Sequence, residues 1–477
     1  MRYLKSFKKL LLLGIFTIAS GCFNEDDLPP KSEIEGENET EETGLDLAQF
    51  NNGNGVMMQA FYWDVEPSGG WYDVVNSKIE DWSQSGINRI WLPSPAKGQS
   101  GGYSMGYDPS DYFDLGEYEQ HGTTETRFGS RAELESLIEK AHANNIEVVA
   151  DIVLGHNSGG GPEYNPYRDK ETFTLFNEAN GNASGLFNRT YEDFHPNSYH
   201  NNDEEAIFYE EQDVCHHQQR VQDWFWAGDN SVAKFYKNTI GFDGWRFDYV
   251  KSFGPWVVEA WNNEVGGFSV GEYWDGNAQT LSDWVDESGS AAFDFACFYK
   301  LDEALDRHSD LTYLDHDMLR KINPEKAVTF VSNHDTEKDS NTDNFISGVN
   351  KMKAYAYILT HDGYPTIFYN DYEGDKKEEM KRLIKIHNSI ASGTIEVLEL
   401  NEKQYIMRRN GDGSNPGLVL YINLSNSNSP VTVSTTWNNK KLYDYSGNVK
   451  ETPHTDENGN VALRAPGYGY AIWSVAE

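Results

Sequence analysis

Eight short apolar runs, separated by longer stretches of helical periodicity, constrain the fold of this chain more than any other feature. The runs are residues 56–63, 87–95, 146–154, 241–250, 266–274, 291–299, 327–335 and 364–371. They lack strict polar–apolar alternation, so they suit strands buried on both faces, as in a parallel sheet. Amphipathic segments such as 130–145, 349–361 and 376–391 lie between them. This order predicts an α/β fold, a (β/α)8 TIM barrel.

Two parts of the chain break this alternation. Residues 155–217 are long, irregular and rich in Asn, Gly, His and Asp, and a connection of that length is usually functional or an inserted domain. After residue 393 short apolar runs alternate with Gly, Asn and Pro turns, which is typical of an antiparallel β-sandwich. We therefore assign 50–154 and 218–392 to the barrel, 155–217 to a small inserted domain after strand three, and 393–477 to a C-terminal β-sandwich.

The first 21 residues have the features of an export signal. Basic residues crowd positions 2–9, and the apolar stretch 10–19 is too short for a lasting membrane span. The sequence Ala-Ser-Gly-Cys at 19–22 resembles a bacterial lipobox, in which the cysteine is lipidated after cleavage. We predict a signal peptide at 1–21 and lipidation of Cys22.

An acidic segment follows the predicted lipidation site. Residues 23–46 contain few apolar side chains and a Pro pair, so they cannot bury enough surface to fold. We predict a disordered tether at 22–49. The acidic residues at 25–27 resemble the export signal of Bacteroidetes-type surface lipoproteins. The expected location is the outer membrane, attached through the lipid anchor, with the membrane face left open.

The charge of the chain limits its partners. A formal net charge of −37 opposes binding to a polyanion, so we predict no nucleic-acid partner. A neutral polysaccharide meets no such barrier. Aromatic residues make up 14% of the chain, and their flat faces either pack in the core or stack on sugar rings. Composition alone leaves both uses open.

Polar residues at the ends of the predicted strands are the candidate site, because the active sites of such barrels lie at the C-terminal ends of the strands. They are His156, Arg246, Asp248, Glu272, His334 and Asp335. A single Asp at a strand end is more often a helix cap or a structural ion pair. Three carboxylates beside two histidines and an arginine are much harder to explain structurally.

These residues fall in segments that resemble the α-amylase family of glycoside hydrolases (family 13). The segments are DIVLGH (151–156), GWRFDYVK (244–251), GEYW (271–274) and VSNHDT (331–336). The resemblance covers essentially residues 55–477. Three further stretches look closest to the archaeal and plant-type α-amylase branch, namely 58–64, 103–118 and 193–200.

The resemblance implies a role for each acid. Asp248 is the expected nucleophile, Glu272 the acid/base and Asp335 the stabiliser of the transition state. Hydrolysis with retention needs two carboxyl groups about 5–5.5 Å apart, and the acid needs a raised pKa. Arg246 is expected to keep Asp248 ionised. The substrate-binding residues implied are Tyr107, His156, Arg246, Lys251 and His334.

The resemblance also implies a calcium site. Asp203, Asp213 and the backbone carbonyl of Ser252 match the family's calcium positions, and oxygen ligands suit Ca²⁺. Gly155 stands where the family supplies an Asn ligand. Water can replace one of about 6–8 oxygens, or the site is weak or empty. Ser252 itself stands where many α-amylases carry His.

A second metal is a separate hypothesis. His195, His200 and Cys215 supply two imidazoles and a thiolate, which are good zinc ligands, and the archaeal relatives place a metal at this pattern. The alternative is that Cys215 is merely buried. Cys215 and Cys297 fall in different predicted elements, so no disulfide framework is predicted.

Together these observations predict a monomeric, secreted, retaining endo-acting α-amylase that hydrolyses internal α-1,4 bonds of starch, glycogen or maltooligosaccharides. One alternative is another α-glucan-active member of the family, either forming maltooligosaccharides or transglycosylating. Another is a non-catalytic surface glycan-binding lipoprotein, which a lost nucleophile or acid would indicate. The sequence retains a carboxylate at both positions, Asp248 for the nucleophile and Glu272 for the acid.

Overall fold

The computed structural model describes residues 46–49, 53–202, 208–337 and 344–475. These belong to one compact unit, Thr43–Glu477. The predicted signal peptide, Cys22, most of the tether and Asp203 lie outside the described residues. Within these ranges, every helix is too short or too polar to cross a membrane.

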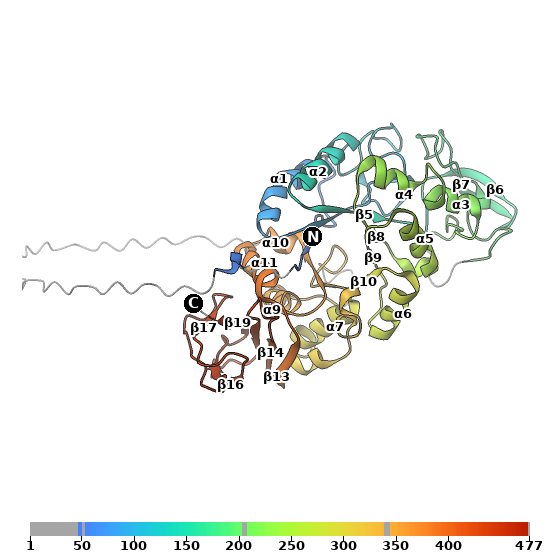
Figure 1. Cartoon of the computed structure of the whole chain (residues 1–477). Coiled ribbons are helices and arrows are strands. Elements are labelled where there is room, and N and C mark those ends of the chain that lie inside the picture. Colours follow the sequence, from blue (N-terminus) through green and yellow to red (C-terminus); the bar gives the residue numbers. More distant parts are fainter. Residues whose placement is uncertain (1–45, 50–52, 203–207, 338–343, 476–477) are drawn as a thin grey trace, which may run out of the picture. The chain divides into compact units, whose positions relative to one another are not determined.

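The centre of the fold is a closed barrel of parallel strands (Figure 1). Around the barrel the order is β1-β12-β11-β10-β9-β8-β5-β2. The strands are β1 Met57–Gln59, β2 Arg89–Leu92, β5 Glu147–Ile152, β8 Gly244–Phe247, β9 Phe268–Gly271, β10 Ala291–Phe293, β11 Ala327–Phe330 and β12 Tyr364–Phe368. Each lies within one of the eight apolar runs, so the predicted TIM barrel is confirmed.

Helices surround the barrel, as the alternating pattern predicts. They are α1 Trp71–Gln84, α2 Arg131–Ala143, α3 Gln219–Gln222, α4 Val232–Phe235, α5 Pro255–Val265, α6 Ala278–Ser288, α7 Phe295–Asp302, α8 Leu319–Ile322, α9 Gly348–Ile358, α10 Tyr369–Tyr372 and α11 Lys377–Ile390. Three of them, α3, α4 and α7, continue into π-helical turns. At α2, Ser130 and Glu133 form a reciprocal capping box, which fixes where that helix begins.

The run at 291–299 is only partly a strand. β10 ends at Phe293, and the next residue, Asp294, caps α7 by accepting a hydrogen bond from the backbone N–H of Cys297 at 2.9 Å. An apolar run cannot by itself distinguish a buried strand from a buried helix. Here the buried Asp is the signal that separates the two.

The inserted region contains regular structure. β6 Gly161–Asn165 and β7 Lys170–Leu175 form an antiparallel hairpin. Arg189 is buried, donates to Asn157 Oδ1 at 2.7 Å and lies 4.1 Å from the ring of Phe176. This side chain ties the region to the loop after β5. Two further short strands, β3 Lys97–Gly98 and β4 Pro109–Asp111, pair beside it.

The C-terminal part is an antiparallel sandwich. A five-stranded sheet has the order β13-β14-β15-β19-β17, and β16 pairs with β18. The strands are β13 Ile395–Asn401, β14 Gln404–Arg409, β15 Leu418–Asn423, β16 Val431–Ser434, β17 Leu442–Asp444, β18 Asn460–Leu463 and β19 Gly469–Val475. His361 at the end of the barrel's last crossover hydrogen-bonds Tyr405 at 2.8 Å, which joins the two parts.

The last residues of the predicted tether are ordered. Leu47–Gln49 form a 3₁₀ helix, the side chain of Leu47 is buried, and Ser389 Oγ donates to the Leu47 carbonyl at 2.9 Å. Burial of this apolar side chain against α11 explains why the folded region begins before residue 50.

Candidate active site

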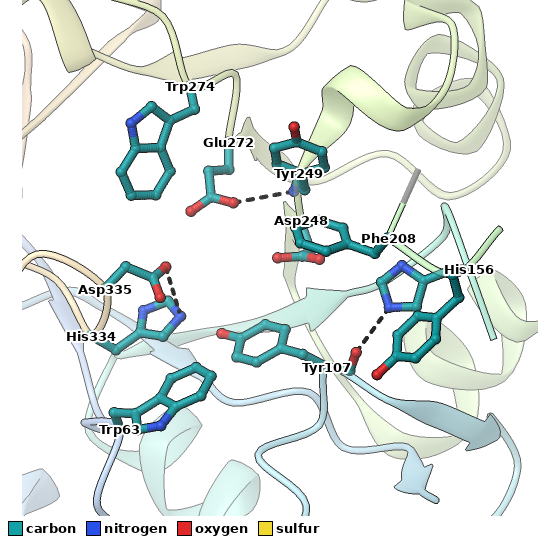
Figure 2. A pocket seen from close by; sticks show the side chains of 11 residues that line it. Trp63, Tyr107, His156, Phe208, Asp248, Tyr249, Glu272, Trp274, His334 and Asp335 are labelled. Atoms are coloured by element: carbon teal, nitrogen blue, oxygen red, sulfur yellow. Dashed lines mark hydrogen bonds and ion pairs between the residues drawn. The ribbon is translucent and has the colours of Figure 1, made fainter. Parts of the chain in front are cut away.

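A cavity of about 380 Å³ opens where the barrel strands end (Figure 2). Its lining residues are Trp63, Tyr107, His156, Phe208, Tyr209, Asp248, Tyr249, Glu272, Trp274, His334 and Asp335. All three predicted catalytic acids are therefore in one cavity. Asp248 follows β8, Glu272 follows β9 and Asp335 lies beyond β11.

Arg246 lies beneath the cavity and connects its acids. The guanidinium is fully buried, and its Nη1 donates to Asp151 Oδ1 at 2.8 Å and to Asp248 Oδ1 at 2.9 Å. Its Nη2 forms an ion pair with Glu272 Oε1 at 2.7 Å. Because both candidate catalytic carboxyls contact one guanidinium, they lie close to each other, as a retaining mechanism needs.

One positive charge among these carboxyls cannot compensate three negative charges in a buried site. A proton must therefore stay in the cluster at neutral pH. Burial, with Arg246 opposing it and the neighbouring acids reinforcing it, raises the pKa of Glu272 to about 8. Burial also raises the pKa of Asp248, against the effect of Arg246. A pKa of about 8 keeps a proton on Glu272 at neutral pH.

His334 stands beside Asp335. Its Nε2 lies 3.3 Å from Asp335 Oδ2, and its Nδ1 lies 2.8 Å from Nε2 of Gln59 on β1. Burial and the charge of Arg246 lower the pKa of His334 to about 3. The imidazole is therefore neutral near pH 7 and carries a single proton.

Aromatic rings form one wall of the cavity. Tyr107, Trp63 and His334 lie nearly parallel, with ring centroids 5.3–6.0 Å apart. The Tyr107 hydroxyl donates to Asp151 Oδ2 at 3.0 Å, so the buried Asp151 fixes both this ring and Arg246. Such a flat surface suits the face of a sugar ring.

His156 lies on the opposite side of the cavity from Asp335 (Figure 2). Its Nε2 is 2.8 Å from the carbonyl oxygen of Tyr107. A carbonyl can only accept, so this nitrogen carries the proton. His156 Nδ1 is then an acceptor for a hydroxyl group.

Lys251 does not line this cavity. Its Nζ pairs with Asp275 Oδ2 at 3.1 Å and lies 4.8 Å from the centre of the Tyr273 ring. It borders a smaller pocket of about 200 Å³ nearby. The predicted contact with an acceptor-side sugar stays a prediction.

Comparison with known proteins shows what the chain is similar to. Residues 418–474 match the family model described as "Alpha-amylase C-terminal". The chain is 27% identical to the cytoplasmic alpha-amylase of Escherichia coli K12, over 89% of this chain and 99% of the relative. It is 28% identical to the alpha-amylase of Geobacillus stearothermophilus, over 88% and 87% of the two chains. The chain is thus similar to α-amylases over most of its length, which supports a glycoside hydrolase.

Solved structures of α-amylases share the fold of this chain. An alpha-amylase from Geobacillus thermoleovorans, crystallised with acarbose, has a TM-score of 0.65 at 18% identity and covers 89% of this chain and 98% of its own. An Anoxybacillus alpha-amylase has a TM-score of 0.66 at 17% identity, with 91% and 99% covered. At these identities the likeness establishes the fold.

The structure adds site residues that sequence reasoning missed. They are Gln59, Trp63, Asp151, Phe208, Tyr209, Tyr249 and Trp274. Asp151 begins the family segment DIVLGH, and Tyr249 directly follows Asp248, so position within a motif could have indicated both. Gln59 is a single polar residue in an apolar run, and only its contact with His334 reveals its place in the site.

The predicted calcium ligands are only partly assembled. Asp213 is buried and its Oδ2 lies 2.9 Å from His195 Nδ1, while Asp203 lies outside the described residues. At Gly155 the space for a side chain is filled, because a Cβ there would lie 2.1 Å from Ser252 Oγ. The two departures from the family pattern, Gly155 and Ser252, are thus in contact. The described residues fit at most a site with fewer protein ligands.

The predicted zinc ligands lie near one another without forming a metal site. The rings of His195 and His200 are 5.3 Å apart, and Cys215 Sγ is 3.7 Å from Asn197 Oδ1. Across the described ranges, no group of three His, Cys, Asp or Glu side chains could hold a metal ion. Zinc stays a prediction to which the described residues add no support. Cys215 and Cys297 are buried free thiols.

Proposed function

We propose that this chain is a retaining, endo-acting α-amylase that cleaves internal α-1,4-glucosidic bonds of starch, glycogen or maltooligosaccharides. One observation supports the mechanism above all others. A single buried guanidinium contacts both Asp248 and Glu272, and the pKa of Glu272 is about 8. In this arrangement Glu272 is protonated near neutral pH, and the charge of Arg246 favours the ionised form of Asp248 that a nucleophile needs.

The reaction follows from these two protonation states. Glu272 gives its proton to the glycosidic oxygen while Asp248 attacks the anomeric carbon, so the leaving chain departs and a glycosyl–enzyme ester forms. Glu272, now ionised, takes a proton from water as that water attacks the same carbon. Asp248 leaves as a carboxylate, and the sugar keeps its configuration.

The remaining groups orient the sugar. Asp335 and the Nε2–H of His334 face the cavity together and suit adjacent hydroxyls. His156 offers an acceptor nitrogen on the other side, and Tyr107 offers its ring face. Hydrogen bonds that strengthen as charge develops on the ring would contribute to the rate rather than to substrate affinity alone.

Replacing Glu272 by glutamine tests this proposal. Glutamine keeps the shape but cannot deliver a proton, so we expect reducing-sugar release from soluble starch to fall by about 10²–10⁴-fold. In the wild type, kcat/KM should fall as pH rises through about 8, because Glu272 then loses its proton. A wild type that releases no sugar would favour the glycan-binding alternative, and equal activity of the two proteins would contradict the assignment.

Product length is a second question within the same function. One relative is the glucan 1,4-alpha-maltohexaosidase of Bacillus sp. strain 707, 27% identical over 70% of this chain and 73% of its own. This supports a maltooligosaccharide-forming variant as the second candidate. A time course on amylose distinguishes the two candidates, since an endo-acting enzyme first gives products of mixed length.

We retain the archaeal and plant-type branch as a proposal that rests on the motif resemblance.

Calcium binding is proposed in a weakened form. With Gly155 lacking the family's Asn, we expect the Tm of the wild type to rise only as free Ca²⁺ approaches about 1 mM. G155N alone should not tighten the site, because Ser252 Oγ fills the space, whereas G155N/S252G should shift the calcium midpoint to lower concentration. Strong destabilisation of the wild type by EDTA at trace calcium would contradict this view.

Export as an outer-membrane lipoprotein is also proposed. It rests on the segment 1–27, which lies outside the described residues. Lipid attached at Cys22 should place the protein in the membrane fraction, and Cys22→Ala should release it. If the wild type and Cys22→Ala fractionate alike, the prediction of a lipid anchor at Cys22 is wrong.

A further inference from the structure

Gln59 is fully buried at the end of β1 and contacts His334, which lines the catalytic cavity. Its backbone is held on both sides, opposite Phe368 of β12 and Trp91 of β2. A side chain on a strand paired with both neighbours is fixed in place more firmly than one on a loop. Its Nε2 lies 2.8 Å from Nδ1 of His334.

The environment of His334 defines which nitrogen carries its proton. An amide –NH₂ group can only donate, so Nδ1 facing Gln59 is the acceptor. On the other side, Nε2 lies 3.3 Å from the Asp335 carboxylate, which is an acceptor when ionised. Reversing the Gln59 amide would put a proton on Nδ1 and leave two acceptors facing each other at Nε2. Both neighbours therefore favour the Nε2–H tautomer.

Aromatic contacts keep the ring from turning. The centroid of the His334 ring lies 5.1 Å from that of Phe61 and 5.7 Å from that of Trp91. The nearly parallel rings of Tyr107 and Trp63 also pack against it. The orientation of the imidazole is thus fixed by packing, and its hydrogen-bonding polarity is set by Gln59.

We propose that Gln59 is a positioning residue that holds His334 as the neutral Nε2–H tautomer, so that this histidine is a hydrogen-bond donor toward the substrate. The inference rests on the proposed function for the identity of that substrate, an α-glucan. Gln59 itself is not among the residues that line the cavity.

Two substitutions separate this role from a packing role. Gln59→Met keeps the volume and removes the donor, and kcat/KM should fall by about 5- to 10-fold without a change in the shape of the pH profile. Gln59→Glu introduces an acceptor that attracts the proton to Nδ1 and raises the pKa of His334. The other charged or titratable groups facing His334 are Asp335, Arg246, Asp151 and Tyr107.

The sign of the pH effect in Gln59→Glu follows from these protonation states. At low pH the imidazolium still presents an N–H at Nε2, so activity is retained. As pH rises through the new His334 pKa, the remaining proton stays on Nδ1 and the donor is lost. We expect an alkaline loss of kcat/KM that begins at lower pH than in the wild type. Gln404→Glu, the same change in the C-terminal sheet, should leave the profile unchanged.

A measurement on the wild type needs no substitution at Gln59. In protein labelled with ¹⁵N-histidine, the signals missing from His334→Asn should show an unprotonated Nδ1 and a protonated Nε2. A protonated Nδ1 would overturn the inference, as would Gln59→Glu with the pH profile of Gln59→Met. If the wild type hydrolyses no α-glucan, the proposed function fails, while the tautomer measurement still decides the role of Gln59.

Discussion

Asp248→Asn is expected to lower kcat/KM on maltooligosaccharides by about 10⁴–10⁶-fold, the range for loss of a covalent nucleophile. Asparagine preserves the shape and the contact with Arg246 Nη1, but its amide cannot form the glycosyl ester. Binding should persist, because the rings and the hydroxyl-binding groups are unchanged. The comparison is made under single-turnover conditions, with affinity measured separately by calorimetry.

Asp286→Asn is the matched control for this substitution. Asp286 is exposed on α6, so the same chemical change there should leave kcat/KM within about twofold, as for other surface substitutions. A residual activity in Asp248→Asn above about one hundredth of wild type, on protein shown by mass spectrometry to retain Asn, would remove Asp248 from the nucleophile role.

Arg246→Met should have the largest effect on stability. Removing the cation that contacts Asp151, Asp248 and Glu272 leaves buried carboxyls uncompensated, at a cost of about 3–5 kcal/mol in the free energy of unfolding near neutral pH. Activity should be lost as well, since the proton distribution between Asp248 and Glu272 depends on this cation.

The stability lost in Arg246→Met depends on pH, and the direction of that dependence can be stated. Without Arg246 the folded-state pKa values of these carboxyls rise further above their unfolded values. Stability from such groups is present below the unfolded pKa and is lost as pH rises through the folded pKa. The free energy of unfolding of Arg246→Met, measured in urea, should therefore be close to that of the wild type near pH 4 and well below it above pH 7. Arg464→Met, at a partly exposed arginine paired with Glu451, should cost about 1 kcal/mol or less.

Much of this architecture is readable from the sequence because burial on both faces leaves a distinct pattern. Each of the eight runs contributes a barrel strand, and the capping box at Ser130 marks a helix start. The run at 291–299 shows the limit, since apolar composition continues across the change from β10 to α7. Local pattern carries no information on that change except through the capping Asp294.

The candidate site was readable in part for a different reason. Polar residues at strand ends are conspicuous against apolar runs, which identified Asp248, Glu272 and Asp335 before any geometry. The sequence linked Arg246 only to Asp248, two residues away, because contacts with Asp151 and Glu272 on neighbouring strands depend on barrel closure. The same holds for Gln59 and His334, which are 275 residues apart in the chain.

The central claim, retaining hydrolysis by Asp248 and Glu272, is tested most directly by the anomeric configuration of new product. Amylose or a long maltooligosaccharide is incubated with the wild type, and the reducing ends are followed by ¹H NMR before mutarotation. The mechanism predicts that the new reducing ends first appear as the α-anomer. An initial β-anomer would contradict it.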